Sequence, residues 1–422
     1  MRRSGTHRAI TAVWQIESAR LIAGLVRMVG DIGLAEDLAQ DALVTALERW
    51  PETGIPDKPG AWLMATAKRR AIDHLRHRAM QERKHEEIGH DLSSRHQADD
   101  EAFDVKEDGA LDDDLLGLIF TACHPVLSHE ARIALTLRLL GGLTTDEIAR
   151  AYLVPEPTVA QRIVRAKKTL AEAKVPFEVP SGRELETRLE SVLEVIYLIF
   201  NEGYAATSGE DWLRPSLCEE ALRLGRILAE LIPREPEVLG LLALMELQAS
   251  RMRARVSKSG EPILLLDQDR SRWDYLLIQR GLAALARAEA KGGLPGPYVL
   301  QASIAACHAR ARTPEATDWK RIAKGYDRLA ETLPSPVVEL NRAVAHAMAF
   351  GPAVGLELVD ALIHERKLAN YHLLPSVRGD FLAKLGRNQE ARQEFERAAS
   401  LTRNTRERDL LLSRARALED GP

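Results

Sequence analysis

Two groups of side chains in this sequence have types and spacings that could support metal binding or catalysis. Cys123, His124, His129 and Glu130 include the ligand types of a zinc site. Pro125 follows directly and Cys123 ends an apolar run, which favours a core thiol and a capping histidine. A second group contains the carboxylates and amide of a general acid–base set: Asn201, Glu202, Asp267, Asp269, Arg270 and Asp274. Acidic residues beside Arg and Trp more often form interhelical salt bridges, so we expect no catalysis, metal or cofactor.

Basic side chains form a third group, with a chemistry suited to phosphate. The net charge of −4 by itself argues against a nucleic-acid binder. The charge is locally segregated, however, with acidic residues between two basic clusters. The first cluster comprises Lys68, Arg69, Arg70, Arg76 and Arg78, against Asp73 alone. The second comprises Arg162, Arg165, Lys167 and Lys168.

The second basic cluster lies in a segment with the pattern of a helix-turn-helix, residues 143–170. Thr144 followed by Glu147 is a capping box that starts a short helix. Val154-Pro155 makes the turn, and Pro157 suits the first turn of the next helix because its missing N–H is not needed there.

The two faces of that next helix differ in character. Its packing face is apolar: Val159, Ile163, Ala166 and Leu170. Its other face carries side chains that can read bases or bind phosphates: Thr158, Gln161, Arg162, Arg165 and Lys168. The alternative is a basic amphipathic helix on the surface of a helical protein.

This segment resembles region 4 of the sigma-70 family, although Leu153 and Pro157 stand where glycines are common. The N-terminal run 31–42, followed by Leu47 and Trp50, resembles the region 2 helix that in this family grips the clamp helices of RNA polymerase. The resemblance assigns polymerase contact to its polar face: Asp37, Gln40, Asp41 and Val44. The alternative is an amphipathic helix with a solvated acidic face.

Residues 62–76 resemble the family's regions 2.3 and 2.4, which open and read the −10 promoter element. The resemblance makes the loop 51–60 the receiver of a flipped base, since basic and aromatic groups can hold single-stranded bases. The residues it assigns to the −10 element are Trp62, Thr66, Lys68, Arg69, Arg70 and Arg76. The alternative is a charged helix with an ordinary core tryptophan.

Composition and periodicity predict an all-α protein of several domains. We expect region 2 at 1–80, an acidic linker at 81–114, region 4 at 115–175, a helical extension domain at 183–290 and TPR-like repeats at 294–422. An offset of 37 residues superposes apolar positions of 341–362 on 378–399, close to a tetratricopeptide unit. The alternative for the repeats is a generic helical bundle.

The order of region 2, acidic linker and region 4 is that of extracytoplasmic-function (ECF) sigma factors. Residues 200–204 and 266–274 resemble features of a subgroup bearing a C-terminal TPR-like extension. The resemblance implies binding to core RNA polymerase and promoter DNA. Because the extension is longer than the sigma domains, we hypothesise separately that it regulates them in cis, with a protein partner as a further possibility. Charges at Glu17, Arg20 and Arg27 argue against a signal peptide or membrane span, so we expect a cytoplasmic protein whose cysteines are reduced.

Two other functions fit parts of the sequence. A helix-turn-helix repressor or activator could sense a ligand or protein through the extension, but this leaves residues 31–76 unexplained. A TPR scaffold without a role in transcription leaves the basic recognition face unexplained.

Overall fold

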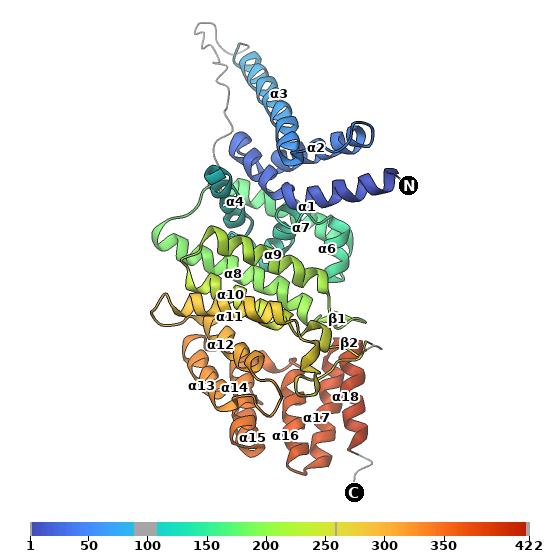
Figure 1. The fold of residues 1–422 in the computed structure, drawn as a ribbon, viewed down its shortest axis with the longest axis vertical. Helices are drawn as coiled ribbons and strands as arrows, with labels where there is room; N and C mark the ends of the chain where they lie inside the picture. Colours follow the sequence, from blue (N-terminus) through green and yellow to red (C-terminus); the bar gives the residue numbers. More distant parts are fainter. Residues whose placement is uncertain (1, 88–107, 258–259, 419–422) are drawn as a thin grey trace. The chain divides into compact units, whose positions relative to one another are not determined.

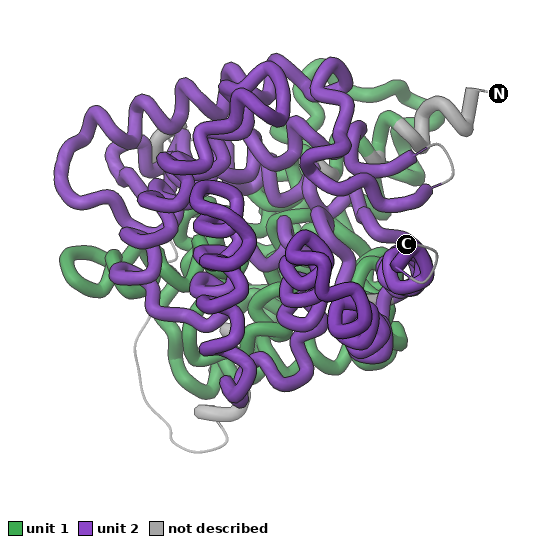
Figure 2. The backbone as a smooth tube through the Cα atoms, turned by 90° about the horizontal axis from the view of Figure 1, so that it is seen from below, with its two compact units in different colours: residues 1–195 green, residues 196–422 purple. Residues whose placement is uncertain are grey.

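The structure is a computed structural model that describes residues 2–87, 108–257 and 260–418, and helices dominate it (Figure 1). The chain divides into two compact units, Met1–Val195 and Ile196–Pro422 (Figure 2). The prediction of an all-α protein with a helical C-terminal extension is confirmed. The domain boundaries expected from sequence stay a prediction.

The first unit begins with three helices, α1 (Arg2–Val29), α2 (Ile32–Thr53) and α3 (Pro59–Glu87). The break between α1 and α2 arises because Gly30 adopts a positive φ of 69° and Asp31 caps α2. The Asp31 carboxylate accepts a hydrogen bond from the backbone N–H of Leu34 at 2.7 Å. Leu25, Trp50 and Leu63 are fully buried between the three helices.

Four further helices complete most of this unit: α4 (Asp108–Ala122), α5 (His129–Leu139), α6 (Thr145–Tyr152) and α7 (Glu156–Glu172). The α4 helix packs on α1, and α5 packs on α7. Their core includes Phe120, Leu135 and Leu137. Both ends of the expected linker 81–114 are helical, because α3 runs to Glu87 and α4 begins at Asp108. The rest of the expected linker, residues 88–107, lies outside the described part.

The division between the units falls within α8 (Gly182–Tyr204). The first half of α8 packs on α4 and α5 through buried polar contacts. Arg188 donates to the carbonyl of Phe120 at 2.9 Å, and the Ser191 hydroxyl donates to the carbonyl of Cys123 at 2.6 Å. Arg132, 5% exposed, forms an ion pair with Glu194 at 3.1 Å. This half of α8 therefore supports the helix-turn-helix.

The described part of the second unit continues with ten α-helices: α9 (Pro215–Leu231), α10 (Pro236–Ala249), α11 (Tyr275–Glu289), α12 (Pro297–Arg310), α13 (Trp319–Thr332), α14 (Pro336–Phe350), α15 (Pro352–Asp360), α16 (Leu373–Lys384), α17 (Asn388–Leu401) and α18 (Thr405–Ala417). Five of these begin at proline, which suits a first turn. Four 3₁₀ turns are η1 (Met252–Ala254), η2 (Leu265–Asp267), η3 (Arg270–Arg272) and η4 (Arg366–Leu368). The strands β1 (Ser208–Gly209) and β2 (Arg403–Asn404) pair in parallel.

Helices α14 and α15 form one pair and α16 and α17 form the next, and the two pairs share one hydrophobic core. Within this core Val359, Leu382 and Phe395 are buried. Glycines permit close approach, because a Cβ at Gly355 would lie 2.4 Å from the Cβ of Ala347. Helix pairs that share a core are what a tetratricopeptide unit requires. Assignment to that repeat class stays a prediction.

Candidate nucleic-acid interface

The predicted helix-turn-helix is formed by α6 and α7, and its capping box is present. The Thr144 hydroxyl accepts from the backbone N–H of Glu147 at 3.2 Å, and the Glu147 carboxylate accepts from the backbone N–H of Thr144 at 2.8 Å. Ile148 and Ala149 are the buried residues of α6, as their spacing predicts. Both local signals in the sequence are therefore confirmed.

The turn after α6 contains an unfavourable backbone conformation. Leu153 caps the helix with φ 50° and ψ 44°, in the left-handed region where side chains are rare. Its side chain is 54% exposed, so burial contributes little in return. Leucine in this conformation therefore carries a backbone cost of roughly 1 kcal/mol that glycine would not have.

The α7 helix presents the polar face that its sequence predicts. Its buried residues are Val159, Ile163, Ala166 and Leu170, all four expected. Among the candidate −35 residues, Gln161, Arg165 and Lys168 are exposed. The other two, Thr158 and Arg162, are half-buried. Lys168 forms an exposed ion pair with Glu172 at 3.6 Å. Such a pair is weak and easily exchanged for a phosphate.

The candidate −10 residues lie along α3 and are not equivalent. The ring of Trp62 meets that of Trp50 edge-on at 5.2 Å between centroids, and the Thr66 hydroxyl donates to the carbonyl of Trp62 at 2.9 Å. Lys68 is half-buried, whereas Arg69 and Arg76 are exposed. The candidate −10 residues thus fall into two groups. Trp62 and Thr66 are half-buried near the start of α3, whereas Arg69 and Arg76 are exposed cations further along the helix.

Arg70 joins α3 to the candidate polymerase-binding face of α2. Its guanidinium forms an ion pair with Asp41 at 2.9 Å and donates to the hydroxyl of Thr45 at 3.0 Å. On the same face Asp37 and Val44 are exposed, and Gln40 is half-buried. Arg70 therefore holds α3 against α2 as well as lying in the candidate −10 set.

Comparison with known families matches both halves of the first unit. The model of sigma-70 region 2 matches residues 16–80, and that of sigma-70 region 4 matches residues 118–170. The chain is an ECF sigma factor of the sigma-70 family. It directs RNA polymerase to promoters and so initiates transcription; its family is not one of enzymes.

One of two relatives of this sigma factor has a description that agrees with the assignment. A probable ECF RNA polymerase sigma factor, SigI of Mycobacterium tuberculosis, is 28% identical over 202 residues, which cover 45% of this chain and 68% of the relative. Uncharacterized protein R00370 of Rhizobium meliloti is 42% identical over 387 residues, 92% of this chain and 90% of the relative. A family of unknown function, DUF6596, matches residues 188–289.

Sequence reasoning missed one residue of the sigma factor that joins region 2 to region 4. Glu36 on α2 is 5% exposed, although it carries a charge. Its carboxylate accepts from the guanidinium of Arg138 on α5 at 2.6 Å and forms an ion pair with Lys167 on α7. Burial alone would raise the pKa of Glu36, but Lys167 and Arg138 outweigh burial and lower it. No local pattern marks Glu36, because both partners are distant in sequence.

The residues considered for a metal site or for catalysis have local structural contacts. Burial raises the pKa of the Cys123 thiol to about 11, and its sulfur lies 3.4 Å from the Thr136 hydroxyl. Glu202 forms an ion pair with Arg214. Asp274 caps α11 by accepting from the backbone N–H of Leu276 at 3.0 Å. Among the described helices, none combines the length and apolar character that a membrane crossing requires.

Proposed function

We propose that α7 reads the −35 element through Thr158, Gln161, Arg162, Arg165 and Lys168. The observation that carries this proposal is the separation of α7 into a fully apolar buried face and an open polar face. Arginine can bond guanine with two N–H groups, and glutamine can bond adenine in the same way. Arg165→Ala should therefore weaken binding of holoenzyme to a −35-dependent promoter by about tenfold or more.

A matched control separates base recognition from loss of surface charge. Arg150 on α6 is exposed and forms an i,i+4 ion pair with Asp146 at 2.9 Å. Arg150→Ala should leave promoter affinity within about twofold, since such pairs contribute little. Equal losses from Arg150→Ala and Arg165→Ala would overturn the assignment of the α7 face.

The same proposal has α3 bind the −10 element and α2 bind core polymerase. Trp62, Thr66, Lys68, Arg69, Arg70 and Arg76 would open and hold the −10 bases. Asp37, Gln40, Asp41 and Val44 would contact core polymerase, in the cytoplasm. Val44→Asp tests the latter assignment, because 51% of this apolar side chain is exposed. Loss of core binding without loss of thermal stability supports it, whereas unchanged core binding contradicts it.

The extension is proposed to regulate the sigma domains in cis or to bind a protein partner. A truncation test needs a matched pair, because Ser191 and Glu194 of α8 contact the buried Arg132. Deletion after Val195 keeps these contacts, whereas deletion after Val179 removes them. Regulation predicts that both deletions change transcription in the same direction. A change after the Val179 deletion alone would instead indicate a damaged region 4.

A helix-turn-helix regulator that senses a ligand or protein through the extension would have no need of region 2, whose family model matches residues 16–80. The α6–α7 geometry alone would serve it equally well. The two functions differ in their need for polymerase. Two results together would favour the regulator: the chain binds specific DNA without core polymerase, and no transcription occurs when core polymerase is added.

A further inference from the structure

The segment between α10 and α11 places three arginines among three aromatic rings in the second unit. The Arg255 guanidinium lies over the Tyr204 ring at 3.5 Å and over the Trp212 ring at 4.5 Å from the centroids. Arg251 lies 5.9 Å from the centroids of both Tyr204 and Trp273. Arg270 lies over Trp273 at 4.8 Å. Guanidinium groups and rings therefore alternate, and we call these three arginines and three rings the arginine column.

Two arginines of the arginine column are buried, and none of its three arginines forms an ion pair with a described carboxylate. Arg255 is 6% exposed and Arg270 is 7% exposed. None of the ion pairs formed by the described residues includes Arg251, Arg255 or Arg270. Glu202 pairs with Arg214 and Asp274 caps α11. The exposed Glu315 attracts Arg270 electrostatically but forms no ion pair with it among the described contacts. Burying a cation without an opposite charge is costly, and arginine does not escape by losing its proton.

Buried hydrogen-bond donors in the arginine column remain unused. The Arg255 Nη1 and Trp273 Nε1 atoms are buried and have no hydrogen-bond partner. Ring stacking covers the faces of a guanidinium and leaves its in-plane N–H groups available for an oxyanion. Arg270 differs, because it donates to the carbonyls of His308 at 2.9 Å and Ala311 at 2.6 Å. Arg270 is thus fixed by protein, while the Arg255 Nη1 group keeps its N–H donors for a ligand.

We propose that Arg251 and Arg255 bind the phosphate group of a small anionic molecule. Arg251 is half-buried and lies at the accessible end of the pair, whereas Arg255 is enclosed between two rings. The two positive charges of the guanidinium groups balance the charge of a phosphate dianion. Their paired N–H groups can donate hydrogen bonds to its oxygens. Arg270 adds a third positive charge beside Trp273. The site is independent of the promoter-binding surfaces and of the proposed regulation.

The test is a titration of the full-length chain with inorganic phosphate, followed by thermal unfolding and isothermal calorimetry at constant ionic strength. A bound anion raises the unfolding midpoint with its concentration, because it binds the folded state. Arg251→Gln should weaken the apparent phosphate affinity about tenfold or more. Arg251→Lys, which keeps the charge but loses the planar fork, should give an intermediate loss.

Arg253 supplies the matched control, because it lies in η1 between Arg251 and Arg255 and is exposed. Arg253→Gln should bind phosphate as the wild type does. Absence of any phosphate effect on the wild type would overturn the proposal, even if a variant failed to fold. Equal affinities of Arg251→Gln and Arg253→Gln would also overturn it. Binding of citrate without binding of phosphate would overturn the choice of phosphate as the ligand.

Discussion

The Glu36 carboxylate on α2 forms an ion pair with the Lys167 ammonium on α7, joining region 2 to region 4. Arg138 on α5 contacts the same carboxylate at 2.6 Å. On a promoter the −10 and −35 elements lie about 25 base pairs apart, or roughly 85 Å at about 3.4 Å per base pair. Under the proposed assignments, this ion pair therefore has to break before both elements are bound.

We expect Glu36→Gln to loosen the contact between α2 and α7. The amide keeps the shape of the side chain but leaves two largely buried cations beside each other, at a cost of about 2 kcal/mol or more. Energy transfer between dyes at Arg49→Cys on α2 and Ala160→Cys on α7 measures the separation, since the three native cysteines are buried. Glu186→Gln, an exposed carboxylate on α8, is the control. Equal transfer efficiency in the Glu36 and Glu186 variants would contradict the expectation.

Leu153→Gly should stabilise the first unit by about 0.5 to 1 kcal/mol, because glycine adopts the observed φ of 50° without steric cost. Chemical denaturation of the full chain, monitored on the first transition, measures the change. Leu153→Ala keeps a Cβ and should give no gain. Stabilisation by alanine as large as that by glycine would show that side-chain removal, not backbone conformation, is responsible.

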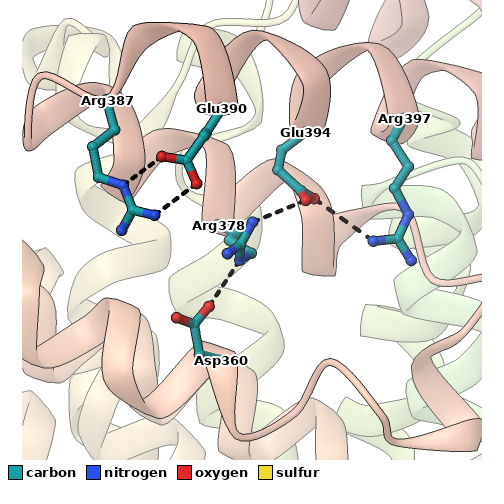
Figure 3. Close-up of polar contacts among 6 residues, drawn as sticks. All are labelled: Asp360, Arg378, Arg387, Glu390, Glu394 and Arg397. Atoms are coloured by element: carbon teal, nitrogen blue, oxygen red, sulfur yellow. Dashed lines mark hydrogen bonds and ion pairs between the residues drawn. The ribbon is translucent and has the colours of Figure 1, made fainter.

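Arg378 on α16 joins two neighbouring helices, as Figure 3 shows. Its guanidinium pairs with Asp360 of α15 at 2.8 Å and with Glu394 of α17 at 3.0 Å. Burial disfavours the charge of Arg378, but the two carboxylates outweigh burial and raise its pKa. We expect Arg378→Ala to destabilise the second unit by about 1 to 3 kcal/mol.

Arg387 provides the comparison for Arg378 within the same region. It pairs with Glu390 of α17 at 2.6 Å (Figure 3). Both side chains of this pair are nearly half-exposed. Arg387→Ala should leave the unfolding midpoint of the second unit unchanged, since exposed pairs contribute little. A larger loss of stability from Arg387→Ala than from Arg378→Ala would contradict this account.

His308 should make the second unit sensitive to acid. Burial, and then Arg251 and Arg270, lower the pKa of His308 to about 3. Its contribution to stability is complete above the unfolded pKa of about 6.5 and is lost progressively as pH falls toward about 3, because only the unfolded state binds the proton there. The loss is on the order of a few kcal/mol.

His308→Phe removes this titration and should flatten the pH dependence of the unfolding free energy between about pH 6 and pH 4. His364→Gln is the control, because His364 is exposed in the loop between α15 and α16. Denaturant titrations at several pH values measure both slopes. A His308→Phe slope as steep as that of the wild type would assign the acid sensitivity to other groups.

Local signals in the sequence were enough to predict the helix-turn-helix. The Thr144–Glu147 capping box and the apolar spacing from Val159 to Leu170 depend only on residues within one or two helical turns. The open polar face of α7 follows from the same periodicity. The roles of its individual residues stay predictions, because exposure and geometry do not identify the base that each contacts.

Contacts between distant segments were beyond sequence reasoning. The partners of Glu36 lie 102 and 131 residues away, and nothing near Glu36 distinguishes it from a solvated carboxylate. The sequence itself marks the motif at 266–274, whereas the stacking of Arg255 between Tyr204 and Trp212 depends on the tertiary fold. The last turns of α3 and the first turns of α4 also lie within the expected linker, because a polar and mainly acidic composition is typical of linkers.

Run-off transcription with purified core RNA polymerase tests the central claim most directly. The template is a promoter selected from the same genome by the holoenzyme. We predict initiation at one defined start when the chain is added, and loss of that transcript with Arg165→Ala but not with Arg150→Ala. Absence of a defined start at every such promoter, with the chain folded and core polymerase active, would contradict the account.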